Sequence, residues 1–264
     1  MENETEKIPI LKFTGKNIDR TEDVVVKEAP LTIILSNQEL VTSLCSPTKL
    51  KYLAVGFLFS EGLLKSKDNI RNIMVDDLHG VVRVETEGDK ELARDFLSKR
   101  LITSGCGKGA SYYSAADMQT QVKVESQIEI SPTEVLALMH EFQNRSQVYR
   151  ATGGVHSAAL CDTKEIIVFN EDIGRHNAMD KIFGECILNN IIIDDHIVLT
   201  SGRISSEILL KVAKRNVPII ISKSAPTNLG VRLANDLGIT LIGFVRGKRM
   251  NVYAHSWRIS ADEE

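Results

Sequence analysis

Between residues 165 and 254 the sequence alternates short apolar runs with segments of helical character, and this alternation constrains the fold more than any other feature. The apolar runs, which we expect to be strands, cover 165–169, 196–200, 217–222, 239–244 and 250–254. Helices are expected at 172–190, 205–214 and 228–237. Short strands that are apolar throughout are buried on both faces, and strands that alternate with helices build a parallel sheet. The pattern predicts a three-layer α/β domain with helices on both faces of a parallel sheet.

The rest of the chain divides into a smaller N-terminal part and a connector. Residues 1–100 are typical of a small α+β domain, with strands at 24–27, 31–35 and 81–85 and helices at 48–59 and 90–100. Residues 101–125 are rich in Gly, Ser and Thr, which predicts a flexible connector. A capping box with proline at the first helical position, Ser131-Pro132-Thr133-Glu134, then begins a helix that runs to about residue 144. The larger α/β domain is therefore expected over 126–264.

Composition excludes several classes of protein. The 264 residues carry a formal net charge of −3, with 25% charged and 43% hydrophobic residues, which is ordinary for a globular protein. A slightly acidic chain has no overall affinity for nucleic acid or an anionic membrane. No stretch approaches the roughly 18–20 apolar residues of a membrane-spanning helix, and the polar N-terminus does not resemble a signal peptide. We expect a cytoplasmic protein that binds neither nucleic acid nor membranes.

One of the four cysteines stands apart from the others. Cys161 and Cys186 lie in apolar surroundings that favour core packing, and Cys45 has no evident role. Cys106 lies in the Gly-rich run TSGCGKGASYYSA, where the nearby Lys108 favours the nucleophilic thiolate. A Cys-dependent hydrolase needs a partnered histidine and a rigid oxyanion site. A flexible Gly-rich loop is poorly suited to holding either group in a fixed position. A mobile thiol that accepts a group and delivers it elsewhere fits this loop better.

The turns that follow the predicted strands indicate an anion site. Ligands of open α/β sheets bind beyond the carboxyl ends of the strands, against helix N-termini. Three turns offer hydroxyl groups, backbone N–H groups or cations there, and their candidate residues are Ser201, Arg203, Ser224, Thr227, Arg246, Lys248 and Arg249. Any single turn of this kind is more often a plain helix cap or a solvated loop than a ligand site. Together the three predict a phosphate-binding crevice.

Two histidines are further candidates. In the turn at 170–177, helical spacing predicts that Asp172 lies beside His176 and that His176 lies beside Asp180. This arrangement either complements the helix dipole or holds a base or sugar edge. His156 follows TGGV in an Ala-rich segment that we expect to be helical. It is either a satisfied core residue or a ligand-binding group.

Five long motifs resemble the FdhD family of formate dehydrogenase accessory proteins, which are sulfur carriers. They are ATGGVHSAALCD, FNEDIGRHNAMDKIFG, LTSGRISSEILLKVAK, VPIIISKSAPTNLGVRLA and GITLIGFVRGKRMNVYAH, and the earlier SPTKLKYLAVGFLFSEGLL also fits. The resemblance implies a cytidine-deaminase-like fold for the larger domain. It implies that Cys106 takes persulfide sulfur from a cysteine desulfurase and passes it to the molybdenum bis(molybdopterin guanine dinucleotide) cofactor of formate dehydrogenase. The cofactor-contacting segment maps onto Phe244, Val245, Arg246, Gly247, Lys248 and Arg249, and GDP is the expected mimic.

The sequence departs from this family at one position. The loop reads Cys106-Gly107-Lys108-Gly109, so Gly109 replaces the second cysteine of the family's CGxCG-type pattern. Transfer through Cys106 alone is chemically sufficient, but the departure leaves open a cofactor-binding chaperone without thiol chemistry. Zinc deamination is excluded because His156-Ser157-Ala158 lacks the required glutamate and the chain has no CxxC. The expected partners are the desulfurase, the catalytic subunit of formate dehydrogenase and a second copy of this chain.

Overall fold

The computed structural model describes residues 3–86 and 123–260. The short helix predicted at 90–100, most of the connector at 101–125, Cys106 and Gly109 lie outside these residues. Domain boundaries at 100 and 125 therefore stay a prediction. Among the described helices, none is long and apolar enough to cross a membrane.

A six-stranded sheet forms the centre of the larger domain, in the order β12-β11-β10-β9-β7-β8. Its parallel strands are β9 (Ile197–Thr200), β10 (Ile219–Ser222) and β11 (Thr240–Arg246). β7 (His156–Cys161) runs antiparallel to β9, β8 (Ile166–Asp172) antiparallel to β7, and β12 (Arg249–Ala254) antiparallel to β11. The wholly parallel sheet that we predicted is therefore wrong, because β7 and β12 run opposite to the other four strands. β7–β8 and β11–β12 are joined by short loops, which only antiparallel neighbours allow.

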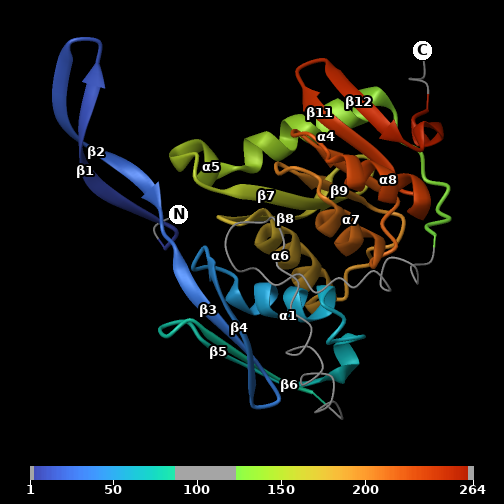
Figure 1. Cartoon of the computed structure of the whole chain (residues 1–264), viewed down its shortest axis with the longest axis horizontal. Helices are drawn as coiled ribbons and strands as arrows, with labels where there is room; N and C mark the ends of the chain where they lie inside the picture. Colours follow the sequence, from blue (N-terminus) through green and yellow to red (C-terminus); the bar gives the residue numbers. More distant parts are fainter. Residues whose placement is uncertain (1–2, 87–122, 261–264) are drawn as a thin grey trace.

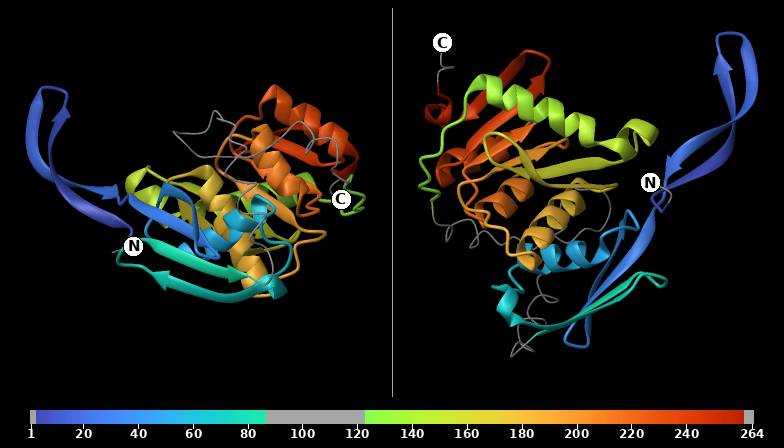
Figure 2. Two further views of the ribbon diagram at one scale, coloured as in Figure 1. Left: turned by 60° about the horizontal axis from the view of Figure 1, so that its bottom comes forward. Right: turned by 180° about the vertical axis from the view of Figure 1, so that it is seen from behind.

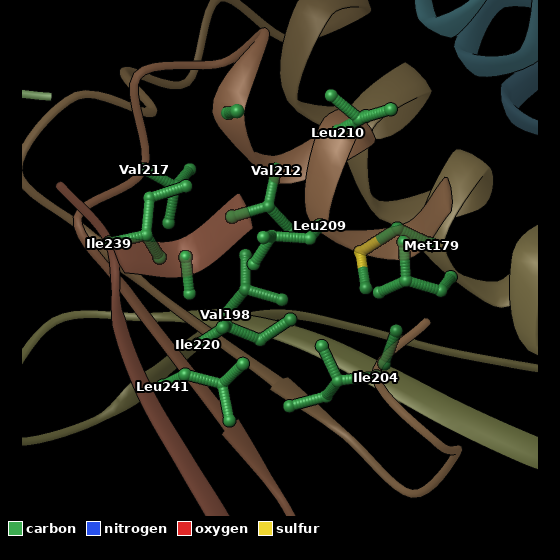
Figure 3. Packing of buried hydrophobic residues seen from close by; sticks show 14 of the residues in the cluster. Met179, Val198, Ile204, Leu209, Leu210, Val212, Val217, Ile220, Ile239 and Leu241 are labelled. Carbon is green, nitrogen blue, oxygen red and sulfur yellow. The ribbon is translucent and has the colours of Figure 1, made fainter. Parts of the chain in front are cut away.

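Helices cover both faces of this sheet (Figure 1). α4 (Pro132–Arg145) packs Leu138 and Phe142 onto one face, with α5 (Gln147–Thr152) after it. α6 (Arg175–Leu188), α7 (Ser206–Ala213) and α8 (Asn228–Leu237) cover the other face. Figure 3 shows this second core, where Leu209 and Met179 pack toward Val198. The predicted three-layer α/β architecture is confirmed, and α4 begins at the predicted capping box of Ser131 and Glu134.

The N-terminal part has its own sheet and core. β3 (Ala29–Leu35), β4 (Gln38–Cys45), β5 (Ile70–Asp76) and β6 (Val81–Thr86) form a sheet in the order β4-β3-β6-β5. α1 (Leu50–Ser60) packs on it, and short 3₁₀ turns lie at Lys67–Asn69 and, near the C-terminus, at Ser256–Arg258. β1 (Thr5–Thr14) and β2 (Asn17–Val26) form a separate hairpin that extends away from the body of the molecule (Figures 1 and 2). The sequence predicted β3, β6, α1 and, with the run at 24–27, the end of β2, but it missed β1, β4 and β5.

Two helices join the N-terminal part to the larger domain at a very close crossing. α1 lies between its own sheet and α6 (Figure 1). A methyl group on Gly56 would overlap the main-chain oxygen of Asp180, and one on Gly184 would overlap that of Tyr52. Beside this crossing, the buried Ser60 hydroxyl donates to Asp180 at 2.7 Å. Glycine is therefore required at both positions for the two helices to touch along their main chains.

Candidate functional site

The predicted site residues of the larger domain all lie at one edge of the central sheet. β8, β9, β10 and β11 run in the same direction, so their carboxyl ends meet there, and β7 begins there with His156. The turns after these four strands supply the remaining residues, which are His176, Ser201, Arg203, Ser224, Thr227 and the 244–249 segment. The fold thus brings the predicted site residues together at this edge of the sheet, and their role in binding stays a prediction.

The turn after β9 is held by its own hydrogen bonds. The Ser201 hydroxyl accepts from the Ser157 backbone N–H at 3.0 Å and lies 3.2 Å from Nδ1 of His156. Ser205 caps α7, so the Ser201 hydroxyl is not the capping group. His156 lies in β7, so the helix that we predicted for its segment is wrong. Arg203 is exposed at the tip of this turn.

The turn after β10 is tied to the one after β9. The Ser222 hydroxyl donates to the Gly202 carbonyl at 2.7 Å and accepts from the Ser224 N–H at 2.9 Å. Thr227 caps α8, and its hydroxyl accepts from the Gly230 N–H at 3.1 Å. The plain capping role that we considered for Thr227 is therefore present. These bonds hold the two turns in a fixed relation.

The turn after β11 leads into β12, which matches the strand predicted at 250–254. It closes the β11–β12 hairpin through Gly247, which has a φ of 59°, so it provides no helix N-terminus. Arg246, Lys248 and Arg249 are exposed, and the Arg246 Nε donates to the Lys223 carbonyl at 3.2 Å. This turn offers three cations at the edge of the sheet.

The remaining members of the 244–249 segment have distinct environments. Phe244 has a φ of 53°, which is uncommon for an aromatic residue, and the Arg246 guanidinium lies 5.8 Å from its ring centre. Val245 is buried in the core beneath α4, so its side chain does not face the edge. The segment therefore presents one aromatic ring among its cations.

The carboxylates near the start of α6 do not pair with His176, so the predicted Asp172–His176–Asp180 arrangement is wrong. Asp172 ends β8 and forms a fully buried ion pair with Lys181 at 2.7 Å. Asp180 forms a buried ion pair with Lys211 of α7 at 2.6 Å. His176 instead places Nε2 at 3.3 Å from Oε2 of Glu207. Both aspartates therefore serve the packing between elements.

Both histidines are neutral at neutral pH. Burial lowers the pKa of His176 to about 3, and the nearby Lys211 and Arg175 charges act in the same direction. Burial and the Arg175 charge also lower the pKa of His156. The imidazoles can therefore offer a hydrogen bond to a ligand, while the positive charge of the edge comes from arginine and lysine.

The site residues predicted from the sequence omit Arg175, although it lies among the polar residues at the start of α6. Arg175 is the first residue of α6 and is only 9% exposed, and its Nε has no hydrogen-bond partner. Its position one residue after the glycine of the 170–177 turn matches that of Arg203 after Gly202. This repeated Gly-Arg pair was the signal that could have identified it.

The described cysteines are unreactive. Cys45, Cys161 and Cys186 are free thiols and all three are buried. Burial raises the pKa of Cys45 and of Cys186 to about 12 and also raises that of Cys161. The core packing predicted for Cys161 and Cys186 is confirmed.

Comparisons with known proteins agree over nearly the whole chain. Sulfur carrier protein FdhD of Bacillus subtilis (strain 168) is 45% identical over 250 residues, which cover 95% of each chain. Sulfur carrier protein FdhD of Staphylococcus aureus (strain MRSA252) is 42% identical over 256 residues, which cover 97% of each chain. A crystal structure from Desulfotalea psychrophila, described as that of a formate dehydrogenase accessory protein, has a TM-score of 0.81 at 26% identity and covers 97% of this chain and 100% of the other. The sequence model of the FdhD/NarQ family matches residues 26–260, so this chain belongs to the FdhD/NarQ family.

Proposed function

We propose that this protein carries sulfur on Cys106 for the maturation of formate dehydrogenase. The observation that carries the proposal is the environment of the other thiols. Cys45, Cys161 and Cys186 are all buried with raised pKa values, so Cys106 is the cysteine left for thiol chemistry. The relatives in Bacillus and Staphylococcus are named sulfur carrier proteins, which supports the same role here.

The proposed transfer needs only one cysteine. The Cys106 thiolate attacks the outer sulfur of a persulfide on a cysteine desulfurase. A new S–S bond forms on Cys106 as the old one breaks, and the desulfurase cysteine leaves as a thiolate. In the second step the outer sulfur passes to its acceptor, which supplies two electrons, and Cys106 is left as a thiol. Gly109 in place of a second cysteine therefore does not block the cycle.

We propose that the acceptor is the molybdenum bis(molybdopterin guanine dinucleotide) cofactor, held as a substrate at the carboxyl edge of the central sheet. The exposed cations Arg246, Lys248 and Arg249 fit its phosphate groups. Phe244 offers an aromatic face close to these cations. The neutral imidazoles of His156 and His176 suit hydrogen bonds to a sugar or base rather than charge pairing.

The proposal includes the setting in which this transfer occurs. We propose that the protein acts in the cytoplasm as a homodimer, with a cysteine desulfurase as donor and the catalytic subunit of formate dehydrogenase as recipient. Desulfurases and their persulfides operate among reduced thiols, and scattered cysteines without pairing suit that environment.

Formate dehydrogenase activity in cells tests the role of Cys106. We expect Cys106→Ala to abolish maturation, while Cys186→Ala, which removes a buried thiol, retains it. Full maturation by Cys106→Ala would contradict sulfur transfer and favour the chaperone that Gly109 leaves open.

Calorimetric titration with GDP tests the cofactor edge. We expect GDP to bind, and Arg246→Gln together with Arg249→Gln to weaken it at least tenfold. Arg232→Gln, which removes an exposed charge from α8, serves as the control and leaves the affinity unchanged. Equal binding by the double variant would contradict a phosphate site at the β11–β12 hairpin.

A further inference from the structure

We propose that Arg175 forms a phosphate-binding subsite with the N-terminus of α6 and the 201–203 turn. The ligand class is a phosphoryl group of a nucleotide. The inference rests on the proposed function only in identifying that nucleotide with the cofactor. The subsite is separate from the basic β11–β12 hairpin.

The state of the Arg175 side chain is the first observation. Arginine is almost never buried without a partner. Arg175 is 9% exposed, and within the described ranges no hydrogen bond or ion pair satisfies its guanidinium. The other strongly buried arginine, Arg258, donates to the carbonyl oxygens of Ser126 and Gly238. The buried Nε of Arg175 therefore lacks the acceptor that a bound anion would supply.

The fold holds the Arg175 side chain against the turn after β9. A methyl group on Gly202 would lie 2.9 Å from Cβ and 3.1 Å from Cδ of Arg175. Gly202 is buried and fixed, because its N–H donates to the Thr200 hydroxyl and its carbonyl accepts from the Ser222 hydroxyl. The glycine thus leaves the space that the arginine stem occupies along the edge of the sheet.

The N-terminus of α6 adds further donors at the same place. α6 has 14 residues, its N-cap is Gly174 without a side-chain cap, and its first turn holds no acidic residue. In the described part of the chain, nothing accepts from the backbone N–H groups of Arg175, His176 and Asn177. Free N–H groups at the positive end of a helix, beside an unpaired guanidinium, are suited to a phosphate.

Two of the three carboxylates near the start of α6 are neutralised by lysines. Asp172 is neutralised by Lys181, and Asp180 by Lys211. Glu207 lies near His176 but is not an ion-pair partner of Arg175. Because His176 is neutral, the Glu207 carboxylate keeps its charge, and a bound phosphoryl group must lie on the Arg175 side of the helix start.

The subsite and the basic hairpin hold different phosphoryl groups. Arg175 packs against the turn after β9, and the hairpin follows β11, with β10 between them. Two strand spacings separate these turns by roughly 10 Å. Losses of affinity caused by changes at the two places should therefore multiply, as expected for independent contacts.

The test titrates the full-length protein with GDP, inorganic pyrophosphate and guanosine. We expect Arg175→Gln to weaken both GDP and pyrophosphate at least tenfold, and Arg175→Lys to weaken them less. Guanosine affinity should not change, because guanosine has no phosphate. Gly202→Ala keeps the charge but displaces the arginine, so it should weaken pyrophosphate as well. Arg232→Gln is the matched control.

The urea unfolding midpoint of the unliganded protein separates binding from a structural role. An unpaired buried charge opposes folding, so Arg175→Gln should unfold at the same or a higher urea concentration. A lower midpoint would contradict the inference, because it would reveal a structural partner.

The outcomes distinguish this inference from the proposed function. If GDP binds the wild type and Arg175→Gln equally well, the Arg175 subsite is wrong and the cofactor edge stands. If pyrophosphate binds through Arg175 while GDP does not bind, the subsite stands and the guanine nucleotide is wrong. If the wild type binds neither GDP nor pyrophosphate, the subsite is overturned, and sulfur transfer through Cys106 is decided by its own test.

Discussion

Gly56→Ala tests the close crossing that joins the N-terminal part to the larger domain. The added methyl group would overlap the main-chain oxygen of Asp180, which no side-chain rotation relieves, so α1 and α6 must separate. Overpacking a tight core costs about 1–3 kcal/mol and occasionally more. Alanine also gains about 1 kcal/mol over glycine in a helix interior. Because the overlap is with the main chain, we take the top of the range, about 3 kcal/mol, and expect a net loss of about 2 kcal/mol.

Urea and thermal unfolding of the full chain measure this loss. A loss of about 2 kcal/mol lowers the melting temperature by roughly 4–8 °C in a chain of this size. Lys51→Ala, on the exposed face of the same helix, is the control and should stay within about 0.5 kcal/mol of the wild type. A Gly56→Ala protein that is as stable as the wild type, or about 1 kcal/mol more stable, would refute the main-chain contact between α1 and α6.

The other predictions concern buried charges beside the same helices. Lys211→Met leaves Asp180 buried without its cation, and we expect a loss of about 3–5 kcal/mol in urea unfolding, because an isolated buried charge is costly. Adding Asp180→Leu should recover most of that loss, and a single variant that loses less than about 1 kcal/mol would contradict the buried pair. His176 has a pKa of about 3 when folded, against about 6.5 when unfolded, so the unfolded chain binds the proton first as the pH falls. Its contribution to stability is therefore fully present above pH 6.5 and is lost progressively toward pH 3, with a limiting slope of about 1.4 kcal/mol per pH unit. Unfolding curves of the wild type and His176→Gln between pH 7 and pH 4 should diverge accordingly, and parallel pH dependences would show that His176 is exposed.

Much of the larger domain follows from local signals in the sequence. The runs that became β9, β10 and β11 are apolar throughout, and Thr227 and Gly238 mark the two ends of α8. The β1–β2 hairpin carried a usable signal that we missed, since Gly15 and Lys16 form a two-residue turn between its strands.

Other features depend on contacts that no local pattern reveals. Ala158 and Ala159 are both buried, so β7 shows no alternation and a short apolar run of this kind does not distinguish strand from helix. Asp180 finds Lys211 on another helix, and Gly56 meets α6 far along the chain. Such pairs arise from packing between elements, which explains why helical spacing gave His176 the wrong partners.

The candidate site was predicted in part for a physical reason. Parallel strands bring their carboxyl ends to one edge whatever their loops contain, so identifying β9, β10 and β11 was enough to gather their turns. The sequence could not show that Arg175 is buried without a hydrogen-bond partner for its Nε, because burial is set only when the elements pack together.

The most direct test of the central claim is mass spectrometry of the peptide that contains Cys106, after incubation with a cysteine desulfurase and sulfur-labelled cysteine. We predict that one labelled sulfur atom appears on Cys106 and that a reductant removes it, while Cys45, Cys161 and Cys186 stay unlabelled because they are buried. An unlabelled Cys106, in a preparation that still supports the maturation of formate dehydrogenase, would contradict the sulfur-carrier account.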